Sequence, residues 1–170
     1  GKSDITVIIV SAAEENDLED NIHGDQHPLL YFDETSESWG KFVVTPFTDK
    51  LNIRLPGEGS NYTVDKASED TGTGFLTTAI VKEGTSIQIY DKGSVSQETI
   101  SNVPYAIERT VDEYGYLCGF SDITGFFDGS IAEIIIYDRA VDLGVIQAAN
   151  VYLNNKYFRE EVELTGGLDI

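Results

Sequence analysis

The chain has little of three things that often settle a protein's class: cysteine, basic residues and long apolar runs. It holds one cysteine, Cys118, in 170 residues, so no internal disulfide can form. Cysteine pairing therefore does not indicate whether the protein works in an oxidising or a reducing compartment. The chain has eleven lysines and arginines and thirty acids, and a net charge of −19 repels a phosphate backbone, so we do not expect a nucleic-acid partner. No stretch approaches the roughly 18 apolar residues of a membrane-spanning helix, so membrane insertion is not expected.

Methionine is also absent, and the first residue is Gly1. Such a start is typical of a processed or excised piece of a longer polypeptide, so a missing signal peptide carries no information about export. The length of 170 residues fits one domain with a single core. We expect that domain to cover 1–158, and we interpret 159–170, with its three glutamates and a Gly-Gly pair, as a tail or linker.

Short runs rich in β-branched and aromatic residues recur between turn residues, which predicts an all-β fold. The runs at 75–81 and 86–90 flank Gly84, and this predicts a hairpin because glycine takes the positive φ that a tight turn needs. The expected strands are Ile5–Val10, Leu29–Phe32, Phe42–Phe47, Leu51–Leu55, Tyr62–Val64, Phe75–Val81, Ser86–Tyr90, Tyr116–Phe120 and Ile131–Tyr137.

One segment near the C-terminus has a helical period. Asp142 fits an N-cap, because its carboxylate can accept a hydrogen bond from a free N–H of the first turn. Ile146, Ala149, Leu153 and Tyr157 then follow at intervals of three or four residues, which places them on one stripe. The pattern predicts a single terminal helix that packs its apolar stripe against a sandwich.

Two adjacent segments resemble a known family. Residues 127–140 read F-D-G-S-I-A-E-I-I-I-Y-D-R-A, and residues 141–157 end in Y-L-N-N-K-Y. They are similar to the last strand and the closing helix of laminin-G-like modules in the concanavalin A-like lectin and glucanase superfamily. The runs at 5–10, 76–90 and 116–119 also fit the order of strands in that family.

The resemblance implies an all-β fold: a two-sheet antiparallel β-sandwich, or jelly roll, with one C-terminal α-helix. In the family, further strands with an R-F-D-G-like stretch precede the strand that resembles Ile5–Val10, and this sequence shows no counterpart. We therefore expect that the chain is a fragment of a larger domain, or that another chain or a rearranged strand covers an exposed sheet edge.

Members of this superfamily mostly bind glycans or proteins, and a minority cleave glycans. The leading hypothesis is a non-catalytic glycan- or protein-recognition module of a secreted, surface or virion protein, with the site in loops at one end of the sandwich. The alternative from a different class is a structural domain of a fibre, adhesin or decoration protein that binds no small ligand. Such a domain would contact copies of itself or neighbouring domains of the parent polypeptide. Fold alone does not separate these functions.

A third hypothesis is a glucanase-like glycoside hydrolase. Residues 15–19 match, as letters, the E-x-D-x-E motif of lichenase- and laminarinase-type glucanases. Those enzymes aim alternate carboxylates of one strand at one face, as a nucleophile and an acid/base about 5 Å apart. The catalytic candidates are Glu15, Asp17 and Glu19. Because Asn16 stands where the sheet should bury an apolar residue, we interpret the stretch as a solvated acidic loop and the chain as no enzyme.

Calcium is the one cofactor that we predict, because carboxylate and carbonyl oxygens are the ligands it prefers and such sites recur in the family. Pairs of acids lie between the expected strands, although none has the spacing of an EF-hand loop. The candidate ligands are Asp33, Glu34, Asp112, Glu113, Asp122 and Asp128.

Tyr31 and Trp39 are the candidate ligand-binding aromatics, because a flat ring can cover the apolar face of a sugar while polar neighbours pair with its hydroxyls. Trp39 lies between Ser38 and Gly40 after a polar run, whereas Phe32 is interpreted as a core residue.

Three further features have ordinary interpretations. His23-Gly-Asp-Gln-His27 offers metal donors without a fixed fourth ligand, so we interpret it as a polar turn. Cys118 is interpreted as a small buried hydrophobe. Asn61 begins an N-glycosylation sequon, Asn61-Tyr-Thr63, which carries a glycan only where the host glycosylates exported proteins.

Overall fold

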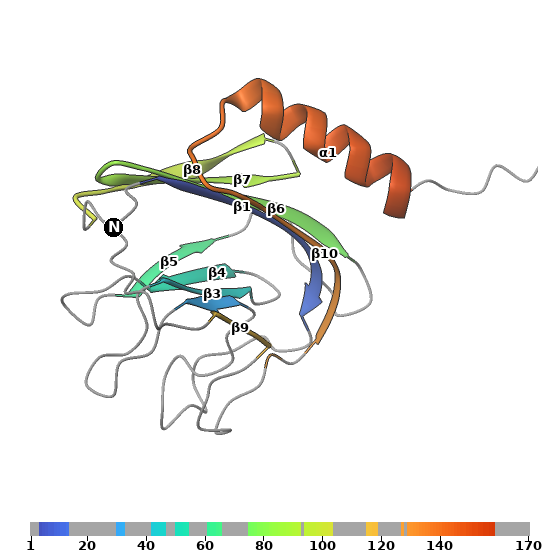
Figure 1. The fold of residues 1–170 in the computed structure, drawn as a ribbon, viewed down its shortest axis with the longest axis horizontal. Helices are drawn as coiled ribbons and strands as arrows, with labels where there is room; N and C mark the ends of the chain where they lie inside the picture. The colour runs from blue at the N-terminus through green and yellow to red at the C-terminus, as the bar shows by residue number, and fades with distance from the viewer. Residues whose placement is uncertain are drawn as a thin grey trace, which may run out of the picture.

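Figure 1 shows a computed structural model of the chain, which consists of two β-sheets packed face to face and one helix. The residues that the structure describes are 4–13, 30–32, 42–46, 50–54, 61–65, 75–92, 94–103, 115–118, 127 and 129–158. Within them, every paired strand is antiparallel to its neighbours. The predicted two-sheet antiparallel β-sandwich with a C-terminal helix is confirmed.

The first sheet has the order β10-β1-β6-β7-β8 and will be called the helix-side sheet. Its strands are β1 (Ile5–Ala13), β6 (Leu76–Glu83), β7 (Ser86–Asp91), β8 (Ser94–Ser101) and β10 (Gly129–Tyr137). The second sheet has the order β5-β4-β3-β2-β9 and will be called the open sheet. Its strands are β2 (Leu30–Phe32), β3 (Phe42–Pro46), β4 (Lys50–Arg54), β5 (Asn61–Asp65) and β9 (Gly115–Leu117).

Strand β1 is apolar on both faces because it serves two cores. Val7 and Ile9 lie in the cluster between the sheets, whereas Ile8 and Val10 lie in the cluster beneath the helix α1 (Leu143–Tyr157). This division follows the alternation of side chains along a strand. A strand covered on both sides reads as a continuous apolar run, and residues 5–10 have that pattern.

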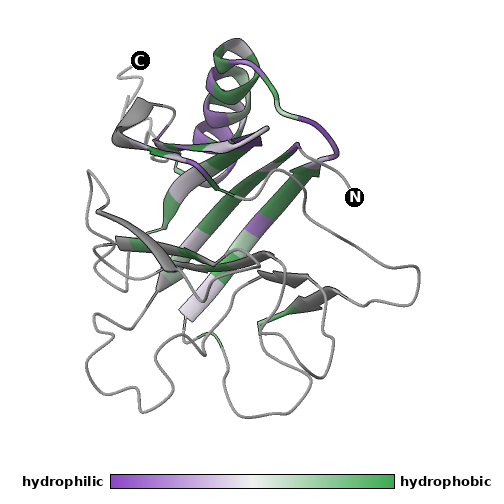
Figure 2. Ribbon diagram, turned by 90° about the vertical axis from the view of Figure 1, so that its left-hand side faces the viewer, coloured by the Kyte–Doolittle hydropathy of each residue, from purple (hydrophilic) through white to green (hydrophobic). Residues whose placement is uncertain are grey.

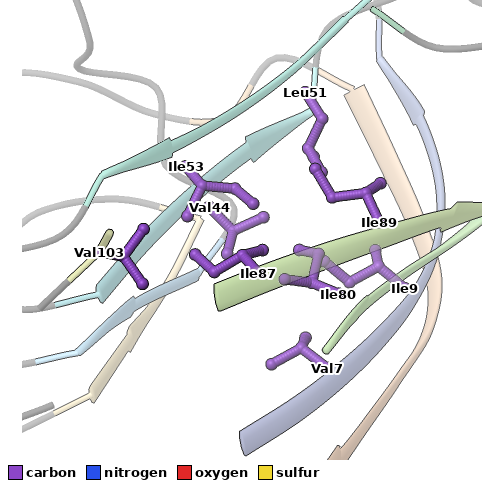
Figure 3. Close-up of a cluster of buried hydrophobic side chains, with 9 residues drawn as sticks. All are labelled: Val7, Ile9, Val44, Leu51, Ile53, Ile80, Ile87, Ile89 and Val103. Carbon is purple, nitrogen blue, oxygen red and sulfur yellow. The ribbon is translucent and has the colours of Figure 1, made fainter. Parts of the chain in front are cut away.

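The core between the sheets is shown in Figure 3. Residues from the helix-side sheet face residues from the open sheet across it, and all are at most 3% exposed. The members are Val7, Ile9, Ile80, Ile87 and Ile89 from the helix-side sheet, Val44, Leu51 and Ile53 from the open sheet, and Val103.

Helix α1 packs on the outer face of the helix-side sheet, as Figures 1 and 2 show. The carboxylate of Asp142 accepts a hydrogen bond of 2.9 Å from the Val145 N–H, which confirms the predicted N-cap. Three of the four predicted stripe residues, Ile146, Ala149 and Leu153, are buried. The fourth, Tyr157, is 36% exposed because it lies at the end of the helix, and its hydroxyl reaches the Ala132 carbonyl of β10.

The β6–β7 hairpin turns at Gly84 and Thr85, between the paired residues Glu83 and Ser86. Gly84 has φ 52°, a conformation that other residues avoid, so the predicted role of this glycine is confirmed. The carboxylate of Asp4 accepts a hydrogen bond of 2.9 Å from the Gly84 N–H, which ties the start of β1 to the turn.

The sequence prediction missed one strand and placed the end of another too late. Strand β8 (Ser94–Ser101) was not predicted, because its polar sequence S-V-S-Q-E-T-I-S lacks an apolar alternation. It forms because it pairs with β7, with a register shift between Gln88 and Tyr90. Strand β9 is shorter than the expected Tyr116–Phe120: it ends at Leu117, where Cys118 takes φ 62°.

Strand β1 is not an edge strand, because it pairs with β10 on one side and β6 on the other. The strands at the ends of the helix-side sheet are β10 and β8. Strand β10 carries a bulge opposite the step from Val10 to Ser11, and its Ile136 is 47% exposed. Cover for this edge, by a second chain or by another segment, stays a prediction.

Candidate functional site

The sandwich has two outer faces, and α1 covers one of them. Its buried residues pack with Ile8 and Val10 of the helix-side sheet. Figure 1 places the open sheet on the opposite side of the helix-side sheet from α1. Among the described residues, no helix covers the outer face of the open sheet. This face is therefore the natural place to look for a ligand site.

Residue positions on the outer face follow from the core. Val44 of β3 and both Leu51 and Ile53 of β4 are fully buried between the sheets. Because residues of a strand alternate between its two faces, the positions beside these three belong to the outer face. The cross-strand pairing then assigns the matching positions of β2, β5 and β9.

Five residues form a row across the outer face, one from each strand, and we call it the outer row. Tyr116 pairs with Tyr31, Tyr31 with Val43, Val43 with Arg54, and Arg54 with Asn61. Neighbouring strands of a sheet lie about 4.8 Å apart, so Tyr31 and Arg54 are about 10 Å apart along the row. The row has two tyrosines at one end, and an arginine and an asparagine at the other.

Two further sets of residues share this face. Thr45, Asn52 and Thr63 pair across β3, β4 and β5, one step along the strands from the outer row. Lys50 pairs with Asp65 one step further. Hydroxyl, amide and charged groups supply both hydrogen-bond donors and acceptors, so the face has the residue types that recognise a polyhydroxylated ligand.

Two of the residues proposed from sequence lie in the outer row. Tyr31, a candidate ligand residue, is the central residue of β2. Asn61, the sequon asparagine, is the first residue of β5 rather than part of the preceding turn, because β5 begins one residue earlier than expected. Their pairing through Val43 and Arg54 is a relationship that the sequence did not reveal.

The other proposed site residues lie outside the described residues. This holds for the catalytic candidates Glu15, Asp17 and Glu19 and for Trp39, so both roles stay predictions. It holds also for all the calcium candidates, which are Asp33, Glu34, Asp112, Glu113, Asp122 and Asp128, and for the His23–His27 stretch. In the part of the chain that the structure describes, no three His, Cys, Asp or Glu residues gather as a metal site would require.

Arg54 and Tyr116 were missed as candidates by sequence reasoning. Residues 50–54 read K-L-N-I-R, and this alternation already separates an apolar face from a polar one. It did not show which strands lie beside β4. Tyr116 stands 85 positions after Tyr31 in the numbering, and only the pairing of β2 with β9 brings the two together.

The titratable residues beneath α1 support the fold. Glu133 of β10 accepts hydrogen bonds of 2.8 Å from Lys156 and from Tyr157, and both bonds lower the pKa of its carboxyl. The same carboxylate raises the pKa of Lys156. Two donors hold this carboxylate as an anion, so it lacks the raised pKa of a general acid. We therefore interpret the cluster as a structural contact that joins α1 to β10.

Cys118 is partly buried, and burial raises the pKa of its thiol. A raised pKa keeps the thiol protonated at neutral pH, so the group is a poor nucleophile. Cys118 is partly rather than fully buried, so its role as a small buried hydrophobe stays an interpretation. In the same described part of the chain, no helix is long and apolar enough to cross a membrane.

Comparisons with known proteins give likenesses in structure only. No protein-family model and no curated protein sequence matches the chain. A heptameric SAP-like pentraxin from Limulus polyphemus matches with a TM-score of 0.64 and 13% identity, over 88% of this chain and 70% of the pentraxin. The CBM40 module of the Ruminococcus gnavus IT-sialidase, bound to α2,3-sialyllactose, matches with a TM-score of 0.65 and 18% identity, over 88% and 84%.

The leech intramolecular trans-sialidase also matches, with a TM-score of 0.61 and 19% identity. This match covers 89% of the chain but only 24% of that enzyme. These likenesses show the fold: the chain is a two-sheet antiparallel jelly roll, which is the fold that the resemblance of residues 127–157 implied.

Proposed function

We propose that the chain is a non-catalytic glycan-recognition module that binds its ligand on the outer face of the open sheet. The observation that carries the proposal is the outer row, in which Tyr116 and Tyr31 stand beside Val43, Arg54 and Asn61. An aromatic pair can stack on the apolar face of a sugar ring. Amide and guanidinium groups at the other end of the row can donate hydrogen bonds to its hydroxyls.

The location of the row supports this function. The opposite side of the sandwich is occupied by α1 and the interior by the core, whereas no described helix covers the outer face of the open sheet. A rigid sheet holds its residues at fixed spacings, which lowers the entropy cost of ordering a binding site. The fold shared with a carbohydrate-binding module that binds sialyllactose adds support.

The setting of the module is part of the proposal. A net charge of −19 keeps copies of the chain apart in solution, which suits a protein exposed outside a cell, on a cell surface or on a virion. A binding role in loops at one end of the sandwich, with Trp39 as an added aromatic, remains compatible with the sheet face as the main site.

A glycan array tests the proposal with wild type, Tyr31→Ala, Tyr116→Ala and a matched control. The control is Tyr152→Ala, because Tyr152 is a 50% exposed tyrosine on α1, away from the open sheet. Losing one stacked ring should weaken retention of a bound glycan about tenfold or more, whereas the control should bind as wild type does. Thermal melting of each variant establishes that it is folded.

Two results would overturn the proposal. If wild type retains no glycan on a broad array, the chain does not have the proposed function. If both Tyr31→Ala and Tyr116→Ala retain the glycan as well as wild type does, the binding site does not lie on the outer row. A β-glucan in the same screen that is cut rather than retained would favour the hydrolase hypothesis on Glu15, Asp17 and Glu19.

A further inference from the structure

The helix α1 lacks the acids that the chain otherwise has in excess. The chain has thirty acids in 170 residues. None of them lies between 143 and 158, and the one charged residue in that range is Lys156. A helix on the surface of a protein ordinarily carries charged residues on its outer face, whereas a helix without them on either face is ordinarily covered. The composition of α1 is therefore that of a helix with a partner on both sides.

Exposed apolar side chains lie on the same helix. Val151 is 58% exposed, Tyr152 50% and Phe158 38%. The sheet beneath α1 does not cover them, because the buried stripe of the helix already fills that contact. Exposed apolar area that is gathered in one place, rather than scattered, indicates a contact with another molecule or domain.

Four exposed residues, Gly144, Ala148, Val151 and Asn155, form a line along α1 that we call the outer line. Their spacings are four, three and four residues, which is the spacing of the seam between two helices of a coiled coil. A helix turns through about 100° per residue, so the four lie within about 60° of one another. The same rotation places them on the side opposite the buried stripe.

The outer line is complementary to itself when a second copy of the helix runs antiparallel to it. We take Ala148 opposite Val151 of the second copy as the register. Two-fold symmetry then also places Val151 opposite Ala148, and Gly144 opposite Asn155. A small residue faces a larger one at each of these positions, so the side chains of the two helices can interdigitate.

The charges at the two ends of α1 favour the same arrangement. Asp142 is exposed at the start of the helix, and Lys156 lies in its last turn. In the antiparallel register Asp142 faces Tyr157 of the second copy, one residue from Lys156, so opposite charges approach one another at both ends. The dipoles of antiparallel helices also attract. A second copy, which carries the same net charge of −19, is repelled least by a surface without acids.

We propose that the outer line, with Tyr152 and Phe158 beside it, is a dimerisation surface on which α1 of a second copy packs antiparallel. The 15 residues of α1 extend over about 22 Å, so the contact is smaller than a standard interface of about 800 Å² per partner. The dimer is therefore weak, with a dissociation constant on the order of 100 μM. Because α1 and the open sheet lie on opposite sides of the helix-side sheet (Figure 1), this contact does not involve the open sheet.

Sedimentation equilibrium of the full chain tests the proposal between about 10 μM and about 1 mM, a range that brackets this dissociation constant. Wild type should pass from monomer to dimer across the range. Raising the salt concentration should strengthen the dimer, because it screens the repulsion between two copies of charge −19.

Val151→Glu should raise the dissociation constant about tenfold or more, because it places a carboxylate from each copy in the centre of the contact. Val151 is exposed, so the variant should fold, and its melting temperature checks this. The matched control is Lys92→Gln, which makes the same change in net charge at an exposed residue outside α1 and should dimerise as wild type does. Gly144 is left unchanged, because a Cβ there would lie 3.2 Å from Asp142 Oδ1.

A mixture of two variants distinguishes a second copy from any other partner. Val151→Glu and Val151→Lys should each dimerise poorly alone, since like charges would meet across the two-fold axis. Mixed in equal amounts, they should form a heterodimer at least as stable as the wild-type dimer, because the new charges are then opposite. No pairing in the mixture would contradict the antiparallel contact at this position.

Two other results would overturn the proposal. Wild type that stays monomeric at the highest concentration and at high salt has no such surface for a second copy. A dimer that forms equally well in wild type and in Val151→Glu uses another surface, and loss of that dimer in Ile136→Lys would assign it to the edge strand β10, where Ile136 is exposed. None of these measurements depends on glycan binding.

Discussion

Lys156 Nζ lies 2.8 Å from Glu133 Oε2, and this ion pair joins the last turn of α1 to the edge strand β10. Tyr157 donates to the same oxygen at 2.8 Å, and its hydroxyl is also 3.2 Å from the Ala132 carbonyl. The ammonium of Lys156 lies 5.4 Å and 5.0 Å from the ring centres of Tyr152 and Tyr157. One carboxylate on β10 therefore organises the C-terminal end of the helix.

Glu133→Gln tests the contribution of this ion pair through the pH dependence of the melting temperature. Hydrogen bonds from Lys156 and Tyr157 lower the pKa of Glu133 in the folded protein. A depressed folded pKa means that the contribution to stability is fully present above the pKa of the unfolded chain, about 4.3, and is lost as pH falls through the folded value. Wild type should melt higher than Glu133→Gln at neutral pH, and the gap should close in acid.

The control for this experiment is Glu83→Gln, because Glu83 is an exposed carboxylate at the β6–β7 turn. The same scan of melting temperature against pH for that variant shows what the loss of an exposed carboxylate without the ion pair to Lys156 does. A gap between wild type and Glu133→Gln that persists below the folded pKa would assign the effect to packing rather than to charge.

Asp142→Ala should lower the free energy of unfolding by about 1 kcal/mol, because it removes the oxygen that caps the first turn of α1. That oxygen accepts the Val145 N–H at 2.9 Å. Asp142→Asn is the matched control, since asparagine caps helices about as well and should cost only a few tenths of a kcal/mol. Urea denaturation measures both variants. Equal losses in the two variants would show that the charge, and not the hydrogen bond, matters.

The success of the Asp142 prediction shows what local sequence can establish. A cap, a stripe of apolar residues and a glycine in a tight turn act over a few positions, and Asp142, Ile146 and Gly84 all lie where their patterns placed them. The resemblance of residues 127–157 added the fold type, and the similar solved structures have the same jelly roll. Strand β8 escaped prediction because its pairing with β7, rather than its own polar sequence, holds it in the sheet.

The candidate site could be predicted only in part, because it depends on pairing between distant strands. Tyr31 was identified by its aromatic ring alone. Its neighbours Tyr116 and Arg54 became visible only when β2 was placed between β9 and β3, and β3 beside β4. A register is fixed by the burial of Val44, Leu51 and Ile53 on the opposite face, and a shift of one residue would reverse every position in the outer row.

The calcium prediction has a direct test that needs no knowledge of its ligands. A protein that binds calcium only when folded gains about 2.7 kcal/mol when the free ion is at a hundred times the dissociation constant. Chelation should then lower the melting temperature, and added calcium, but not magnesium, should restore it. Asp112→Asn and Asp122→Asn, measured separately, distinguish two of the candidate groups. A melting temperature that does not change after chelation would contradict the calcium prediction.

Lys82 gives a second prediction about pH, with the opposite direction. Its side chain is completely buried, and its ammonium donates a 2.7 Å hydrogen bond to the Gly84 carbonyl. Burial lowers the pKa of Lys82, and the nearby charge of Asp4 opposes this shift only in part. The unfolded chain therefore holds this proton up to a higher pH than the folded protein does.

It follows that stability rises with pH between the folded pKa and the ordinary lysine value of about 10.4, because the unfolded state binds more protons there. Lys82→Met removes the titrating group and keeps most of the buried chain length. The difference in free energy of unfolding, wild type minus Lys82→Met, should thus grow in favour of wild type from neutral to alkaline pH. Urea denaturation across that range measures it, with the exposed Lys92→Met as control. Parallel curves for wild type and Lys82→Met would mean that the buried ammonium has an unshifted pKa, held there by Asp4 and the Gly84 carbonyl.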